Sequence, residues 1–331
     1  MSPAQALRFA IALCSAHILL PVASPQQSNP VKVHQITGLV GVKDNAKGLL
    51  SVEGDHLHFT RGNQTSDVAA TSMQDVVTGA DTEKAVGKTI GLLSMAAPYE
   101  SGRFLSLFRK KIDTLTIKYR DSDGALHGAI FTMHVGNAEV LRKGLLAQDA
   151  HSVASETDVT HPTSTNAPDQ PSVQMSIAPS VQSNQPAPVK IKASAIQVEM
   201  IQSDEIKLPS EFQVALYEKL IQQLQKRGTF QHVFRDGDRN AADVSGLVIL
   251  QSNVRGFKAG SERAREVTTV FGATSIKVHC RFTNPEGATL LERDVSGKVR
   301  FFGGNLRATY DFAKKTARVA RENFSSTGPA Q

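Results

Sequence analysis

The first half of the chain alternates between apolar and polar positions in short runs that turn residues separate. In GLLSVEGDHLHFT, Leu50 and Val52 precede the turn residue Gly54, and Leu57 and Phe59 follow it. Alternation on both sides of a glycine-containing turn is typical of a β-hairpin with one buried face. This run therefore predicts a hairpin.

A second run, DTLTIKYRDSDGALHGAIFTM, repeats this pattern around Asp123-Gly124. The stretch NAEVLRKGLLAQ follows it and predicts a short helix with Asn137 as its N-cap. We expect several antiparallel strands closed by one terminal helix over residues 31–147.

The second half of the chain mixes the periods of strands and helices. SAIQVEMIQ predicts a strand, and a helix is expected after Pro209, with Ser210 as N-cap and Gln213 completing a capping box. Gly228 is expected to end this helix. Four strands then follow, the last two joined by a turn at residues 284–287.

A final helix is predicted from Asn305, because apolar residues recur there every three or four positions and leave a basic face. The order β-α-β-β-β-β-α over residues 193–326 predicts an antiparallel or mixed sheet packed by two helices. The chain as a whole is predicted to be α+β.

Residues 148–192 are rich in Ser, Thr, Pro, Gln and Asn and show no apolar period. Such a segment cannot bury enough apolar surface to offset the entropy of ordering it. It is predicted to be a disordered linker between two domains, at 31–147 and 193–326. A long tether would let two modules engage separate targets.

The N-terminus has the layout of a secretory signal peptide over residues 1–24. Arg8 precedes the apolar run from Phe9 to Val22, and small residues follow. The run is shorter than the ~20 residues of a spanning helix, although an uncleaved leader that anchors the protein is the alternative. Leu13 before Cys14 does not fit a lipobox, and Cys280 is expected to be a buried strand residue.

Composition narrows the functional classes. The chain of 331 residues is 40% hydrophobic and 21% charged, lacks tryptophan and carries a net charge of +6. These values fit soluble domains, and the mild positive charge does not require a nucleic-acid partner.

The stretch GFKAGSERAREVTTVFGA, at residues 256–273, is the most site-like part of the sequence. It lacks the GK[ST] and G-x-G-x-x-G patterns of phosphate-binding loops. Arg263 and Arg265 are candidate contacts to an anionic surface, but an exposed connection between two strands is the favoured interpretation.

Two resemblances to known families emerge from these patterns. Gly256, Gly260-Ser261, Arg263-Ala264-Arg265 and Phe271-Gly272-Ala273, with the order of elements around them, resemble the bacterial domain of unknown function 4410 family over about residues 195–325. This resemblance implies an exported envelope protein and transfers no catalytic residues. The strands and terminal helix of residues 35–147 resemble PH-like and GRAM-like domains, which implies a β-barrel closed by a helix.

The sharpest basic cluster is Arg109, Lys110 and Lys111. In a PH-like barrel such a cluster can meet anionic head groups, although a solvated strand end is the favoured interpretation. His56 and His58 share one face of a strand, but no third metal ligand is placed by the sequence.

These observations predict an exported, non-enzymatic bacterial envelope protein, periplasmic or associated with the outer membrane, that acts as a binding or scaffold module. Its expected partner is an envelope protein, a membrane surface or a wall polymer, with no nucleic acid, cofactor, metal or evident small-molecule substrate. One alternative is anionic-lipid binding through the PH-like domain. Another is a metal-dependent hydrolase with a site assembled from His56, His58, His232 and Asp236.

Overall fold

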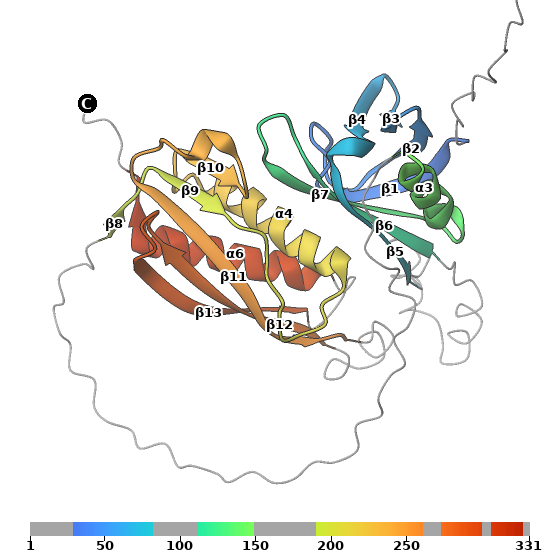
Figure 1. Cartoon of the computed structure of the whole chain (residues 1–331). Coiled ribbons are helices and arrows are strands. Elements are labelled where there is room, and N and C mark those ends of the chain that lie inside the picture. Colours follow the sequence, from blue (N-terminus) through green and yellow to red (C-terminus); the bar gives the residue numbers. More distant parts are fainter. Residues whose placement is uncertain (1–28, 82–111, 149–189, 261–272, 300–305, 327–331) are drawn as a thin grey trace, which may run out of the picture.

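The computed structural model describes residues 29–81, 112–148, 190–260, 273–299 and 306–326. These residues form two units, each built on its own β-sheet (Figure 1). The N-terminal unit holds a seven-stranded sheet and the C-terminal unit a five-stranded sheet. The chain is therefore α+β, as predicted.

The seven-stranded sheet is antiparallel, in the order β4-β3-β2-β1-β7-β6-β5. Its strands are β1 (Val31–Thr37), β2 (Ala46–Glu53), β3 (His56–Arg61), β4 (Gln64–Ala69), β5 (Met73–Asp81), β6 (Ile112–Arg120) and β7 (Leu126–His134). The first predicted hairpin is confirmed, with Val52 paired to Leu57. The second is confirmed as β6–β7. The edge strands β4 and β5 do not pair with each other, so hydrogen bonds do not close this sheet into a barrel in the described residues.

Helix α3 (Asn137–Leu146) covers the sheet through the buried residues Ala138, Leu141 and Leu145. Asn137 is the first helical residue and not the predicted N-cap, which is Gly136 at a φ of 90°. Glycine accepts this left-handed conformation without strain, so the chain can turn sharply from β7 into the helix. The Gly136 N–H donates to the carboxylate of Asp113 on β6 at 2.6 Å.

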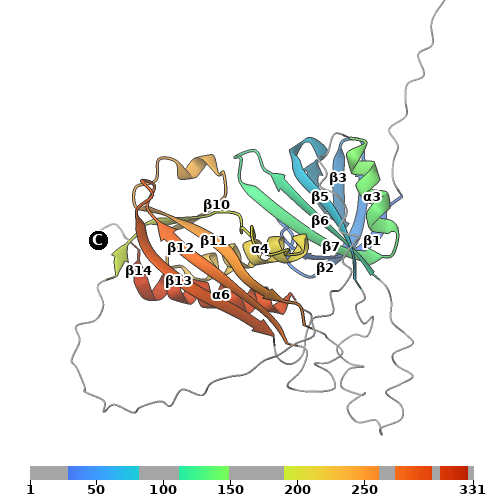
Figure 2. The same ribbon diagram turned by 60° about the horizontal axis from the view of Figure 1, so that its bottom comes forward.

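The C-terminal unit follows the predicted order of elements. Its sheet has the order β10-β9-β11-β12-β13, with β9 parallel to β10 and β11 and the other pairs antiparallel. The strands are β9 (Ala195–Val198), β10 (His232–Arg235), β11 (Leu247–Lys258), β12 (Thr274–Thr283) and β13 (Thr289–Val299). Helices α4 (Ser210–Arg227) and α6 (Arg307–Asn323) lie side by side on one face of this sheet (Figures 1 and 2).

The predicted capping box of α4 does not form. Pro209 is the N-cap, and the Gln213 side chain donates instead to the carbonyl of Ile201 at 2.6 Å. A tertiary hydrogen bond therefore replaces the local one. Gly228 ends the helix in the left-handed conformation, as predicted.

Two boundaries differ from the predictions. Ile191 and Lys192, expected in the linker, form strand β8 (Ile191–Lys192) parallel to β14 (Phe324–Ser325). Strand β11 continues to Lys258, so the start of the glycine-containing stretch is strand and not connection. The leader and linker residues 149–189 lie outside the described residues, and the domain division stays a prediction.

The two units contact each other through α4, which lies between the sheets in both views (Figures 1 and 2). Ile130 of β7 packs with Val214 and Ala215 of α4 in a buried apolar cluster. A Cβ on Gly128 would lie 2.6 Å from a Val214 methyl group, so only glycine permits this approach of β7 to the helix. The units therefore share a packed interface.

Candidate functional site

The basic residues predicted to meet an anionic surface lie outside the described residues. These are Arg109, Lys110, Lys111, Arg263 and Arg265. Their role stays a prediction. Arg109 to Lys111 directly precede β6, and Arg263 and Arg265 fall between β11 and β12.

The four residues of the hydrolase hypothesis do not converge at one site, although the rings of His56 and His58 are neighbours on β3. His56 and His58 lie on β3 and bind Asp55 and Asp67, while His232 on β10 stacks with Phe234. The carboxylate of Asp236 accepts a hydrogen bond from the Met200 amide at 3.0 Å. No three His, Cys, Asp or Glu side chains within the described ranges gather closely enough to hold a metal ion.

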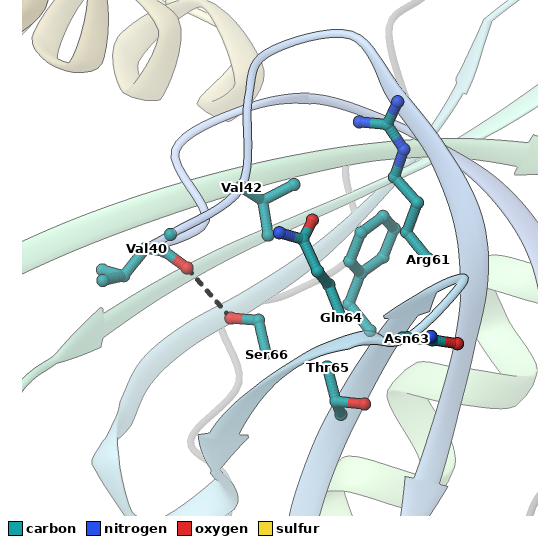
Figure 3. A pocket seen from close by; sticks show the side chains of 9 residues that line it. Val40, Val42, Arg61, Asn63, Gln64, Thr65 and Ser66 are labelled. Carbon is teal, nitrogen blue, oxygen red and sulfur yellow. Dashed lines mark hydrogen bonds between the residues drawn. The ribbon is translucent and has the colours of Figure 1, made fainter.

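A pocket of about 310 Å³ opens between the β1–β2 loop and the β3–β4 hairpin (Figure 3). The hairpin contributes its tip and the ends of both strands, and the loop crosses over them. The lining residues are Val40, Gly41, Val42, Phe59, Arg61, Asn63, Gln64, Thr65 and Ser66.

A hydrogen bond ties the loop to the hairpin, because Ser66 Oγ donates to the Val40 carbonyl at 3.1 Å (Figure 3). Phe59 is 1% exposed and forms an apolar wall. Arg61 is the single charged residue in the lining, and Gln64 adds an amide. The lining thus combines an apolar wall with hydrogen-bond donors and one positive charge, which suits a small ligand or ligand segment that carries an anionic group.

The lining residues also limit the chemistry of the pocket. They include no carboxylate, imidazole, thiol or amine, the groups that ordinarily accept or donate protons in catalysis. These residues can bind and orient a ligand but offer it no general base.

A second polar cluster lies at the interface between the units. Glu218 of α4, whose side chain is 1% exposed, accepts bonds from Arg235 Nη1 at 2.7 Å and Nη2 at 2.9 Å. It also accepts a bond from the Gly128 amide of β7 at 3.0 Å. Arg235 in turn donates to the Leu126 carbonyl at 3.0 Å. The ion pair is thus hydrogen-bonded to the neighbouring unit.

Burial shifts the pKa values in this cluster. Burial alone would lower the pKa of Arg235, but the charge and hydrogen bonds of Glu218 raise it above its usual range. Burial raises the pKa of Tyr217, whose hydroxyl donates to the Leu126 carbonyl and accepts from the Asp236 amide. Arg235 therefore stays charged and Tyr217 stays neutral, and their contacts are structural.

Neither the pocket nor the interface cluster was predicted from the sequence. The pocket joins residues 40–42 to residues 59–66, and the polar tip RGNQTS of the hairpin is its one local signal. The interface ion pair joins residues 218 and 235 to the β6–β7 hairpin, and no spacing in the chain indicates it.

Comparisons with known proteins give similarity only to solved structures. No family model and no curated protein matches the chain. One structural match is a variant PelC dodecamer from Paraburkholderia phytofirmans, with 11% identity and a TM-score of 0.30 over 42% of this chain and 92% of that one. Another PelC dodecamer from the same organism shows 10% identity and a TM-score of 0.32 over 40% and 89%. At these scores the matches support no argument about function or assembly.

No helix in the described part of the chain is long and apolar enough to cross a membrane.

Proposed function

We propose that this chain is an exported, non-enzymatic binding protein of the bacterial envelope, and that the pocket beside the β3–β4 hairpin holds part of its ligand. The pocket lining is the observation that carries the proposal. It offers an apolar wall, amides, hydroxyls and one guanidinium, and no group suited to proton transfer. The N-terminal run with the layout of a signal peptide supports export.

We further propose that the N-terminal unit is a PH-like domain. The meander order β4-β3-β2-β1-β7-β6-β5, followed by a single helix that packs on the sheet, supports this proposal. The likeness of the C-terminal unit to the domain of unknown function 4410 family remains a proposal of the same kind.

Because Arg61 is the single charge in the pocket, we expect the ligand to carry a carboxylate or phosphate. Such a group occurs in acidic wall polymers, in peptide C-termini and in anionic lipids. The first two classes fit a soluble binding protein, and the third corresponds to the lipid-binding alternative.

The test is binding by the mature chain to three probe classes: uronic-acid oligosaccharides, short peptides with a free C-terminus, and phosphatidylglycerol vesicles. Ligand-observed NMR serves for the soluble probes and co-sedimentation for the vesicles. We expect binding to one soluble class, and we expect Arg61→Gln to weaken it about tenfold or more, the loss of one charged hydrogen bond.

The matched control is Arg293→Gln, because Arg293 is exposed on β13 and, among the described residues, its side chain bonds only to the Glu292 carbonyl. Salt-sensitive vesicle binding that survives Arg61→Gln would favour the lipid alternative. Absence of binding to every class, or equal effects of the two substitutions, would refute the pocket as a ligand site.

A further inference from the structure

His56 and His58 lie on the outer face of β3, and each contacts a carboxylate. His56 Nδ1 lies 2.6 Å from an oxygen of Asp55, and His58 Nδ1 lies 2.6 Å from an oxygen of Asp67 on β4. An ionised carboxylate can only accept hydrogen bonds, so each Nδ1 carries the proton. The lone pair of each neutral imidazole is therefore on Nε2.

The two rings lie on the same side of the sheet. Residues at positions i and i+2 of a strand share a face, and the ring centroids are 5.9 Å apart. The side chains of His56 and His58 are 42% and 25% exposed, so solvent and ions reach them. No hydrogen bond from either Nε2 to another described residue is present.

The surroundings of the pair are negative. Glu53 lies directly across from His56 in the β2–β3 register, and Asp55 and Asp67 hold the two rings. Clustered carboxylates raise the local concentration of cations.

We propose that His56 and His58 chelate a divalent transition-metal ion such as Zn²⁺ or Ni²⁺ through their Nε2 atoms. A carboxylate on the second ring nitrogen is the usual way in which proteins orient a metal-binding histidine and raise its basicity. Two imidazoles suit Zn²⁺, Ni²⁺ and Cu²⁺. Since no three His, Cys, Asp or Glu side chains of the described residues converge, water or a ligand from another molecule fills the remaining positions.

The pair is separate from the pocket, because Phe59 and Arg61 alternate with His58 along β3 and face the other side of the strand. The metal site consequently does not rest on the proposed ligand. Its failure and the failure of the pocket can be distinguished, because Arg61→Gln leaves both imidazoles in place.

The test is isothermal titration of the mature chain with Zn²⁺ and Ni²⁺, each in a buffer that does not chelate metals. We expect one ion per chain in the tightest class of sites. His56→Gln or His58→Gln each removes the chelate and should weaken binding at least tenfold. Asp67→Asn keeps both imidazoles and should weaken binding by about tenfold, the lower end of the loss found for carboxylates that support a metal ligand.

His279 provides a matched control. It makes the same contact, with Nδ1 2.8 Å from Asp294, but no second histidine stands beside it on β12. We expect His279→Gln to leave the affinity unchanged. Long-range ¹H–¹⁵N NMR should show the Nε2 signals of His56 and His58 shifting on metal addition.

Two results would overturn the proposal. One is the absence of saturable binding to either ion, and the other is an equal loss of affinity in the His58→Gln and His279→Gln variants. Thermal melts of each variant check that the exposed substitutions leave the fold intact.

Discussion

The ion pair between Glu218 and Arg235 makes the sharpest prediction about stability. We consider Glu218→Ala, which removes the carboxylate and shortens the side chain to a methyl group. In the native protein this carboxylate accepts two bonds from Arg235 and one from the Gly128 amide. The substitution leaves a guanidinium whose side chain is only 18% exposed without its counter-ion.

The magnitude follows from that geometry. Removing one partner of a buried, hydrogen-bonded ion pair costs about 3–5 kcal/mol, because the remaining charge is neither hydrated nor paired. Each 1.4 kcal/mol changes the ratio of folded to unfolded protein about tenfold. Domains are stable by only about 5–15 kcal/mol, so Glu218→Ala should shift the urea midpoint strongly.

The assay is urea denaturation followed by circular dichroism, with Glu205→Ala as the control. Glu205 pairs with Arg255 at 3.0 Å, but both side chains are largely exposed, and such pairs contribute about 0–1 kcal/mol. Glu218→Leu combined with Arg235→Met should recover much of the loss, because it removes both charges. If Glu218→Ala costs no more than Glu205→Ala, the contact between the units does not hold in solution.

Four further predictions each concern a single residue. Gly38→Ala should destabilise the fold by about 3 kcal/mol or more, because the φ of Gly38 is +90° and an added Cβ would meet the Gly128 carbonyl. The control is Gly41→Ala, which should cost about 1 kcal/mol, because Gly41 has a φ of +75° but lies in open space. Thermal melts compare the two variants. Gln35→Met should stabilise the protein by about 1–2 kcal/mol in urea denaturation, because both polar side-chain atoms of the buried Gln35 lack a partner in the described structure. If stability does not rise, an internal water satisfies these two atoms. Burial and the charge of Arg235 lower the pKa of His127 below 6.5, despite the bond of this residue to the Asp121 carboxylate. As the pH drops below about 6.5, the unfolded chain therefore binds the proton before the folded chain does, and the stability of the fold should fall. In thermal melts from pH 7.5 to 5, His127→Gln should make this fall less steep. Burial raises the pKa of the Cys280 thiol to about 11, so a thiol reagent should modify it only after denaturation, and rapid native labelling would contradict its burial.

The sequence predicted those elements whose signals are local. The β2–β3 hairpin follows from alternation and a two-residue turn, and the order of the C-terminal unit follows from seven successive patterns. Both helix N-caps were predicted wrongly, because long-range groups compete with local ones. The Asp113 carboxylate accepts a hydrogen bond from the Gly136 amide ahead of α3, and the Ile201 carbonyl accepts one from the side chain of Gln213. The burial of Cys280 was predicted correctly from alternation along its strand.

The pocket could not be predicted in the same way. Its residues come from a loop and a hairpin that the sheet order brings together, and no residue type in it is unusual for an exposed turn. The histidine pair was visible in the sequence, but its carboxylate partners were not, because Asp67 reaches His58 only through the β3–β4 register.

The composition of strand β7 does indicate the contact between the units. The β7 run LHGAIFTM has apolar or small residues on both faces, a composition typical of a strand that is covered on both sides. Ala129 and Phe131 pack in the core of the N-terminal unit, and Gly128 and Ile130 face α4.

This contact changes where a partner can bind. Two independent modules on a tether would each expose a full surface, but α4 already covers the β6–β7 side of the N-terminal sheet. In the order β4-β3-β2-β1-β7-β6-β5, the β3–β4 hairpin lies on the other side of β1 from β7. The hairpin therefore remains open, and both the pocket and the histidine pair lie on it. A binding partner should consequently protect the amides of β3 and β4 from hydrogen exchange and leave those of β7 unchanged. Protection centred on β7 would mean that the partner displaces α4.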